Sequence, residues 1–427
     1  MEKNISIAKL HRYFMASTGV STDTRQIQIG QLFFCLKGEN FNGNKFSKKA
    51  LEMGAAYAII DEEEYYIDDR TLLVTDVLEY LQQLAAFHRR QFNISFLGIT
   101  GTNGKTTTKE LINAVLSKGF VTHATAGNFN NHIGVPLTIL SIPKDTEIAI
   151  IEMGASHQGE IAELCRIAEP DYGIITSIGK AHLEGFGSLE GVIKTKRELY
   201  EAVEQKAGKV FVNADSDVIM KMSEGIDSIT YGESAKADIK AKKLNKGAFA
   251  SLVWNGMEIE SQLVGGYNFY NMLAAITIGN YFQIEDEKIA EALREYAPNN
   301  KRSQWMKTQK NEIILDAYNA NPSSMEVALD SFKSIKTASK WCILGDMLEL
   351  GDESEKEHRK LIESIDEEQL KKTIFVGAEF VKVAKDLIAF KNTQEAKEWL
   401  LENPIKESLI LMKGSRGISL EKLLEEL

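Results

Sequence analysis

The residues best suited to chemistry lie in one stretch, Phe96–Thr108, with the sequence FLGITGTNGKTTT. Its pattern is typical of a short apolar strand, a glycine-rich turn and a helix that begins near Lys105. Glycines in the turn let backbone N–H groups converge on phosphate oxygens, and the helix N-terminus adds partial positive charge. Lys105 would then meet the outer phosphates, and the Thr106 hydroxyl could bind Mg²⁺. The strict phosphate-binding pattern has glycine six residues before the lysine, where this chain has Ile99. The stretch therefore predicts a variant nucleotide-binding loop.

Two further polar residues follow apolar strands in the same predicted domain. Glu152 ends the strand that begins at Ile148, and His182 follows a predicted strand over residues 172–178. Ligands gather at the carboxyl ends of strands in open parallel sheets, so both residues are predicted to lie near the loop. Glu152 is a candidate Mg²⁺ ligand, and His182 is a candidate for ligand binding or proton transfer. The alternatives are a surface glutamate and a structural histidine.

One lysine lies on the apolar face of the helix predicted to follow Ser188. Lys196 lies seven residues after Leu189, in the same stripe as Val192 and Leu199. An ammonium group that points into packed structure is unfavourable unless it is paired or chemically modified. The alternative is a side chain whose stem packs while its ammonium reaches water. The spacing alone favours neither interpretation.

The stretch after residue 206 predicts further strands and loops, followed by a helix over Met272–Tyr281. Asn268 and Asn271 lie three residues apart at the start of that helix. Residues of this type at this place either cap the helix or contact a ligand such as a nucleotide base.

Strands and helices alternate from about residue 298 to the end of the chain. This alternation predicts a doubly wound, mostly parallel sheet whose polar strand ends line a cleft towards the central domain. Asn321 is predicted to cap a helix that has Pro322 at its first position. The predicted strands cover residues 312–315, 341–344, 373–376 and 408–412.

Length and composition limit the class of protein. The 427 residues exceed what one hydrophobic core supports, so two to four domains are expected. A net charge of −11 argues against nucleic-acid binding. Cys35, Cys165 and Cys342 are widely spaced in apolar surroundings, which favours buried free thiols over a disulfide framework or metal cluster. The N-terminus has no secretory core and no run reaches membrane-spanning length, which predicts a cytoplasmic protein.

The resulting prediction is an α/β fold with three domains, over residues 1–90, 91–297 and 298–427. The first is a small α/β unit that could bind part of a ligand or serve only for packing. The second is the mostly parallel domain of the phosphate-binding loop, and the third is Rossmann-like.

These motifs resemble those of the Mur ligases, the ATP-dependent amide ligases of bacterial peptidoglycan synthesis, over essentially the whole chain. Sister ligases tend to have histidines where this chain has Asn319-Ala-Asn321, so this stretch separates subfamilies. The matching stretches are residues 23–25 with 30–33, 101–106, 128–136, 152–155, 181–184, the Lys196 helix, and residues 316–325, 344–351 and 413–416.

The resemblance implies an N-terminal domain for a UDP moiety, a central ATPase and a C-terminal domain for ATP and the incoming amine. It implies ATP and two Mg²⁺ sites, with catalytic roles for Lys105, Lys196, Glu152 and His182. Metal-binding residues would be Thr106, Glu152, His182 and Lys196. Nucleotide-binding residues would be Gly101, Thr102, Asn103, Gly104, Lys105, Thr106, Thr107, Asn268, Asn271, Arg302 and Asp316. Substrate-binding residues would be Asp23, Thr24, Arg25, Asn130, Asn131, Asn319, Asn321, Ser415 and Arg416.

The resemblance also implies that Lys196 reacts with carbon dioxide to form N6-carboxylysine. A carbamate would turn a misplaced cation into an anion that helps to place the second Mg²⁺. Two departures from the family pattern are Tyr267 and Asn44, at positions where the family usually has histidine. They concern the base contact and the muramoyl-peptide contacts, respectively.

Within the family, the chain is most similar to the ligase that joins D-alanyl-D-alanine to UDP-N-acetylmuramoyl-tripeptide through an acyl phosphate. The resemblance thus implies a role in cell-wall synthesis, and with it in cell shape and division, for an enzyme expected to be a monomer. One alternative is another Mur-type or folylpolyglutamate-type ligase. A second is a nucleotide-dependent switch or assembly protein that uses hydrolysis for conformational change.

Overall fold

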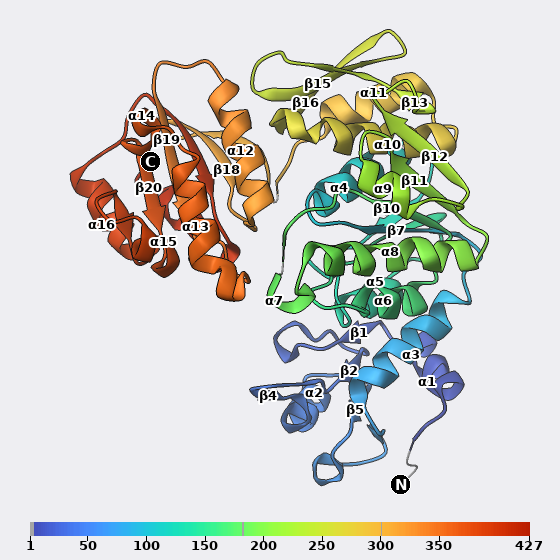
Figure 1. Cartoon of the computed structure of the whole chain (residues 1–427). Coiled ribbons are helices and arrows are strands. Elements are labelled where there is room, and N and C mark those ends of the chain that lie inside the picture. Colours follow the sequence, from blue (N-terminus) through green and yellow to red (C-terminus); the bar gives the residue numbers. More distant parts are fainter. Residues whose placement is uncertain (1–3, 182, 300) are drawn as a thin grey trace.

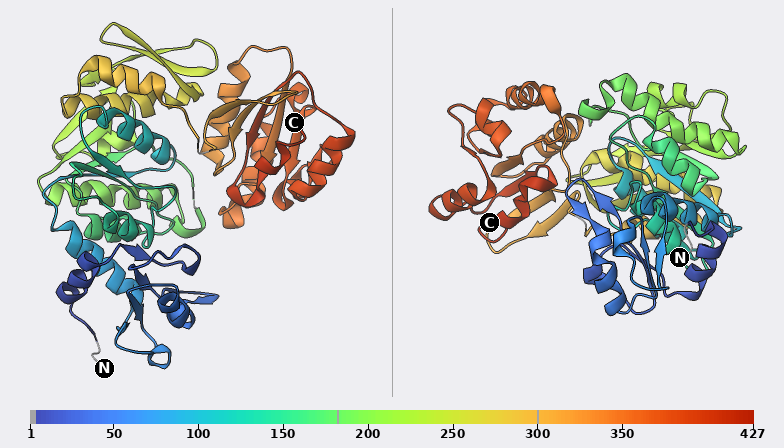
Figure 2. Two further views of the ribbon diagram at one scale, coloured as in Figure 1. Left: turned by 180° about the vertical axis from the view of Figure 1, so that it is seen from behind. Right: turned by 90° about the horizontal axis from the view of Figure 1, so that it is seen from below.

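The computed structural model describes residues 4–181, 183–299 and 301–427. The chain forms three lobes in sequence order, coloured blue, cyan to yellow, and orange to red in Figure 1. Figure 2 shows that the N-terminal and C-terminal lobes each lie against the central lobe. The predicted three-domain α/β architecture is confirmed. The domain boundaries near residues 90 and 297 stay predictions.

The N-terminal lobe is a parallel sheet with the strand order β1-β2-β5-β6. Successive strand residues face opposite sides, so Leu32 and Phe34 pack towards α1 and α3 while Phe33 packs towards α2. A hairpin of β3 and β4 extends from the sheet. The elements are α1 (Ile7–Ala16), β1 (Val20–Ser21), β2 (Leu32–Phe34), β3 (Lys37–Gly38), β4 (Phe41–Asn42), α2 (Ser47–Glu52), β5 (Tyr57–Ile60), β6 (Thr71–Leu73) and α3 (Val77–Arg89).

The central lobe is built on a parallel sheet with the order β13-β12-β11-β10-β7-β9-β8. The strand before the phosphate loop, β7, is therefore an interior strand of this sheet. One face packs against α4, α10 and α11, and the other against α5, α6 and α8. The strands are β7 (Ser95–Thr100), β8 (Thr122–Ala124), β9 (Ile148–Glu152), β10 (Tyr172–Ile175), β11 (Lys209–Asn213), β12 (Ser228–Gly232) and β13 (Ile239–Lys240). The helices are α4 (Lys105–Leu116), α5 (Gly134–Leu140), α6 (Glu160–Ala168), α7 (Leu183–Phe186), α8 (Leu189–Gln205), α9 (Asp217–Met222), α10 (Phe269–Tyr281) and α11 (Asp286–Glu295).

Helix α3 joins the first two lobes into one packed body. Its residues Leu81 and Leu84 share a hydrophobic core with Leu10 of α1 and with Ile139 and Leu164 of the central lobe. Within the described residues, no helix is both long and apolar enough to cross a bilayer.

A small antiparallel sheet covers α11 at the far end of the central lobe (Figure 1). The sequence predicts strands in this part of the chain but not this separate sheet. It consists of β14 (Lys242–Leu244), β15 (Phe249–Trp254) and β16 (Met257–Val264).

The C-terminal lobe has a sheet with the order β17-β18-β22-β19-β20-β21, in which β17 alone among the described strands runs antiparallel. The predicted strands are present, and Asn321 caps α12 with Pro322 at its first position, as predicted. The elements are β17 (Gln304–Lys307), β18 (Glu312–Asp316), α12 (Pro322–Ser334), β19 (Lys340–Gly345), α13 (Ser354–Glu363), α14 (Glu367–Leu370), β20 (Thr373–Val376), α15 (Ala378–Val383), β21 (Ala389–Phe390), α16 (Thr393–Glu402) and β22 (Leu409–Lys413).

Candidate active site

The phosphate loop has the predicted strand–turn–helix geometry. It leaves β7 at Thr100, and α4 begins at Lys105 after Gly104, whose φ of 82° lies in the left-handed region that favours glycine. Gly101 also has a positive φ of 148°, and a Cβ there would lie 2.1 Å from Thr176 Oγ1. Both glycines are therefore required by the path of the loop.

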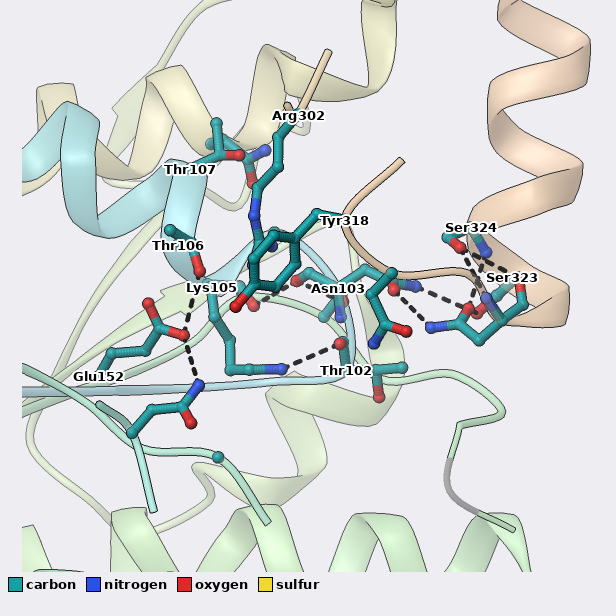
Figure 3. A pocket seen from close by; sticks show the side chains of 18 of the residues that line it. Thr102, Asn103, Lys105, Thr106, Thr107, Glu152, Arg302, Tyr318, Ser323 and Ser324 are labelled. Atoms are coloured by element: carbon teal, nitrogen blue, oxygen red, sulfur yellow. Dashed lines mark hydrogen bonds between the residues drawn. The ribbon is translucent and has the colours of Figure 1, made fainter. Parts of the chain in front are cut away.

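Lys105 is the first residue of α4, and its side chain folds back over the loop. Its Nζ donates to the carbonyl oxygens of Gly101, at 2.7 Å, and Thr102, at 3.1 Å. Figure 3 shows this side chain in the cavity near Tyr318. Burial lowers the pKa of Lys105 to about 8, with Glu152 opposing the shift and Arg302 adding to it.

Glu152 lies at the end of β9 beside the loop, as the strand-end argument predicts. Its Oε1 accepts hydrogen bonds from Thr106 Oγ1 at 3.1 Å and from Asn130 Nδ2 at 2.8 Å. Its Oε2 is buried and has no partner among the described residues. A buried carboxylate oxygen left unpaired is unfavourable, so this atom marks a place for a positively charged ligand.

Lys196 is buried in α8, with 2 % of its surface exposed. This excludes the alternative in which its ammonium reaches water. The Nζ atom lies 5.4 Å from the centroid of the Phe186 ring. Burial and then the charge of Lys105 lower its pKa to about 7, and Glu160 and Glu198 oppose the shift. A substantial neutral fraction at neutral pH makes this amine nucleophilic.

Asn268 and Asn271 lie at the start of α10, and Asn271 contacts α4, the helix that follows the loop. Asn268 Nδ2 donates to Val264 O at 2.8 Å, and no side-chain cap forms. Asn271 Nδ2 donates to Asn268 Oδ1 at 2.8 Å, and its Oδ1 accepts from Thr108 Oγ1 at 3.0 Å. The capping alternative is wrong for this pair. Helix α10 begins at Phe269, three residues earlier than predicted.

The C-terminal lobe contributes an ion pair from two adjacent strand ends. The register of β18 with β22 places Asp316 opposite Lys413, and Lys413 Nζ lies 2.6 Å from Asp316 Oδ2. Lys413 is buried. Lys413 lies within one of the matching motifs but has no predicted role, although its position at a strand end is a signal that could identify it.

Arg302 and Tyr318 both line a cavity between the central and C-terminal lobes. The guanidinium carbon of Arg302 lies 4.0 Å from the centroid of the Tyr318 ring, and Figure 3 shows the two side chains above Lys105. The Nε atom of Arg302 is buried and has no hydrogen-bond partner among the described residues. Cation–π stacking holds the guanidinium in place, and its free donor is available to an anionic ligand.

The phosphate loop is also joined directly to the N-terminus of α12. Asn321 Nδ2 donates to Asn103 Oδ1 at 2.8 Å, and Asn103 Nδ2 donates to Ser323 Oγ at 3.1 Å. These bonds connect residues more than two hundred positions apart and bring the two lobes together over the loop (Figure 3).

A cavity of about 820 Å³ lies between the central and C-terminal lobes. It brings together most of the residues that the sequence analysis selects. The predicted site residues that line it are Thr102, Asn103, Gly104, Lys105, Thr106, Thr107, Asn130, Asn131, Glu152, Asn268, Asn271, Arg302, Asp316, Asn319, Asn321 and Arg416.

Several predicted site residues do not line this cavity. Gly101 forms the base of the loop, and Lys196 is buried in α8. Ser415 is buried, and its Oγ accepts from the backbone N–H of Leu348 at 3.0 Å. His182 lies outside the described residues.

Asp23, Thr24 and Arg25 lie apart from the cavity, in the N-terminal lobe. Asp23 Oδ2 accepts from Arg25 Nη2 at 2.6 Å. This interaction lowers the pKa of Asp23 to about 2. The buried Asn44 faces inward, where its Oδ1 accepts from the backbone N–H of Asp61 at 3.0 Å.

Comparisons with known proteins agree with this geometry. Three Mur ligase family models match the chain: "Mur ligase family, catalytic domain" at residues 17–89, "Mur ligase middle domain" at 99–279 and "Mur ligase, glutamate ligase domain" at 301–416. The UDP-N-acetylmuramoyl-tripeptide–D-alanyl-D-alanine ligase of Bacillus subtilis is 35 % identical over 96 % of this chain and 93 % of its own length. The chain belongs to the Mur ligase family.

Further Mur ligases extend this result. The Escherichia coli ligase of the same name is 31 % identical over 96 % of this chain and 93 % of its own. A crystal structure of MurF from Acinetobacter baumannii has a TM-score of 0.85 at 29 % identity and covers 98 % of both chains. The MurF ligase from Thermotoga maritima, solved in complex with ADP, has a TM-score of 0.84 at 25 % identity over 97 % of both.

Proposed function

We propose that this chain is an ATP-dependent ligase that joins D-alanyl-D-alanine to UDP-N-acetylmuramoyl-tripeptide. The observation that carries this is the cavity in which the phosphate loop meets Asn319-Ala-Asn321 of the C-terminal lobe. That stretch is the one in which the sister ligases tend to have histidines. Relatives that match over nearly the whole chain have this ligase name, which supports the same choice.

The reaction runs in two steps. The substrate carboxylate attacks the γ-phosphorus of ATP, the bond to the β,γ-bridging oxygen breaks, and an acyl phosphate and ADP form. The amine of D-alanyl-D-alanine then attacks the acyl carbon and loses a proton, and phosphate leaves as the amide forms.

The chain's own residues hold the nucleotide for the first step. Lys105 exchanges its two carbonyl partners for phosphate oxygens, and the backbone N–H groups at the start of α4 bind the same anion. Arg302 offers its unpartnered Nε to an anionic part of ATP. Fixed positive groups of this kind stabilise the charge on a transferring phosphoryl group.

The donor set around Glu152 fits Mg²⁺. The ion prefers carboxylate, hydroxyl and phosphate oxygens and keeps several waters. Here Glu152 contacts the Thr106 hydroxyl through Oε1 and leaves Oε2 unpartnered. Among the described residues no group of three or more His, Cys, Asp or Glu side chains converges. We therefore propose that ATP oxygens complete this site, where Mg²⁺ supplies charge neutralisation and orientation of the phosphates. His182 remains a predicted second ligand.

The surroundings of Lys196 fit a carbamate. The buried amine has a lowered pKa, and among the described residues no hydrogen bond or ion pair of its Nζ is found. Only the neutral amine reacts with carbon dioxide, so this pKa favours the modification. We expect Lys196→Ala to lose nearly all ligase activity and a short-chain carboxylate to restore part of it. Full activity of Lys196→Ala without any additive would remove this role.

The peptide and UDP parts of the substrate are assigned to the remaining predicted residues. Asn130, Asn131 and Asn319 line the cavity from the central and C-terminal sides, which suits contacts to the reacting ends. The UDP moiety is assigned to the N-terminal lobe around Asp23–Arg25. The cytoplasmic location, the monomeric state and the exact domain boundaries stay predictions.

Mass spectrometry of products tests the function. The purified chain is incubated with ATP, Mg²⁺, D-alanyl-D-alanine and UDP-N-acetylmuramoyl-tripeptide with either lysine or diaminopimelate at the third position. We expect the mass of the corresponding pentapeptide and one phosphate released for each amide formed. A product with a different amine in a parallel screen would identify another ligase of this family. ATP hydrolysis without any amide would favour a nucleotide-dependent switch.

A further inference from the structure

A short strip of the central lobe lies beside the C-terminal lobe. Its described parts are residues 179–181 and helix α7 (Leu183–Phe186). Figure 1 shows α7 at the side of the central lobe that faces α13. Three separate parts of the C-terminal lobe contact this strip: the N-terminus of α12, the turn before α13, and α13 itself.

The strip is closely packed at both of its ends. A Cβ at Gly179 would lie 2.9 Å from Ser323 Oγ of α12, so a larger residue here would displace the Ser323 side chain. A Cβ at Gly351, in the turn before α13, would lie 3.3 Å from Glu184 Cβ of α7. The two lobes therefore also contact one another at Gly179 and at Glu184, and not only at the phosphate loop.

Between these contacts lies an ion pair across the two lobes. Lys180 Nζ lies 3.3 Å from Glu357 Oε1 of α13. The Glu357 side chain is 3 % exposed and that of Lys180 is 50 % exposed. A carboxylate removed from water is costly unless a cation compensates its charge. Among the described residues, Lys180 is the cation paired with Glu357.

The strip also connects the two predicted catalytic lysines. At its start, the Gly179 N–H donates to Thr102 Oγ1 at 3.0 Å, within the loop that holds Lys105. At its end, the Phe186 ring lies 5.4 Å from Lys196 Nζ. A C-terminal lobe docked on the strip thus contacts residues next to both groups, at Gly179 and at Glu184.

We infer that Lys180 and Glu357 are positioning residues for the ligase reaction. Their ion pair holds the C-terminal lobe against the strip. It thereby keeps the phosphate loop and the Lys196 site in a fixed position relative to one another. The effect on catalysis rests on the proposed function, whereas the docking can be measured without it.

A charge swap tests the pair. Lys180→Glu and Glu357→Lys each place like charges together, whereas the double variant restores attraction. We expect each single variant to lower kcat/KM by about tenfold or more and the double variant to recover most of this loss. The matched control is the Arg359–Glu355 pair on the same helix, which lies within one lobe. Reversing either of its charges should leave kcat/KM near the wild-type value.

A second readout follows the docking itself. Dyes on cysteines placed at the exposed positions Glu402 and Asn280 report the distance between the lobes by energy transfer. With a non-hydrolysable ATP analogue, we expect lower transfer in the single variants and wild-type transfer in the double variant. A merely structural role of Glu357 would change the unfolding midpoint without this rescue.

The inference is overturned if the single variants keep wild-type kcat/KM or wild-type energy transfer, or if either value stays low in a folded double variant. If Glu357→Lys does not fold, Glu357→Gln replaces it, and Lys180→Glu must then cost less in that background than in the wild type. If the wild-type chain forms no amide, the proposed function fails. Energy transfer still tests whether the ion pair docks the two lobes.

Discussion

The phosphate loop and the N-terminal lobe hold their predicted site residues in opposite ways. At the loop, Thr106 and Asn130 converge on Glu152, and one oxygen of that carboxylate is left for a ligand. In the N-terminal lobe, Asp23 pairs with its own neighbour Arg25 at the surface. The loop therefore leaves a polar atom for a ligand, whereas the charged groups of Asp23 and Arg25 pair with one another.

The difference shows where local sequence determines a site. A strand, a glycine turn and a helix fix the directions of the N–H groups and of Lys105 within a few residues. The Asp23–Arg25 turn does not by itself indicate a binding site, because a similar Asp-x-Arg arrangement recurs at Asp68 and Arg70. Local geometry therefore identifies the first site and leaves the second to be tested.

Of the effects that bear on this comparison, the largest is expected at the loop. Lys105→Ala removes the cation nearest the predicted phosphates and should lower kcat by about a hundredfold or more. Single-turnover phosphate release measures this loss. Lys118→Ala, just beyond the other end of α4, is the control, because Lys118 pairs with Glu295 at the surface. Equal turnover of Lys105→Ala and the wild type would contradict the assignment.

A smaller effect, on stability and with a defined pH dependence, is expected at Lys196. Burial lowers its pKa from 10.5 to about 7, so the unfolded chain binds more protons between these values. Wild-type stability should therefore rise with pH across this range, and below it the cost of the buried ammonium is complete. Lys196→Met should raise the unfolding midpoint more at pH about 6 than at pH about 10.

Calorimetry in bicarbonate-free buffer measures both midpoints, since a carbamate would hide the effect. Lys194→Met is the matched control, because Lys194 lies two residues away on the exposed side of α8. A gain that is the same at both pH values would show that Lys196 does not titrate as its burial requires.

Much of this site follows from the sequence because strand ends in parallel sheets share one edge. The place of Glu152 is therefore predictable from its own strand. The pairing of Lys413 with Asp316 is not, because it depends on the register of two strands almost a hundred residues apart. Asn268 was ambiguous for a related reason, since its partner Val264 belongs to a sheet that the sequence did not predict.

A moderate effect on stability is expected at Asn44. Asn44→Ala leaves the backbone N–H of Asp61 without its partner and should lower the free energy of unfolding by about 1–3 kcal/mol. Urea unfolding measures this change. Asn40→Ala is the control, because Asn40 is exposed in the same loop. If Asn44→Ala leaves stability unchanged but weakens binding of the UDP substrate, Asn44 serves the ligand rather than the fold.

The smallest effect on stability is expected at Asp23, where only substrate binding should change. An exposed ion pair contributes little to folding, so Asp23→Ala should keep the wild-type unfolding midpoint. Its predicted role would raise KM for the UDP substrate and leave KM for ATP unchanged. Asp68→Ala is a close control, since Asp68 also accepts from the backbone N–H and the Nη2 of the arginine two residues on, in the same lobe. Steady-state kinetics of both variants decide the matter. If the two raise KM for the UDP substrate equally, the effect belongs to a common turn geometry, and if neither does, Asp23 has no part in the substrate site.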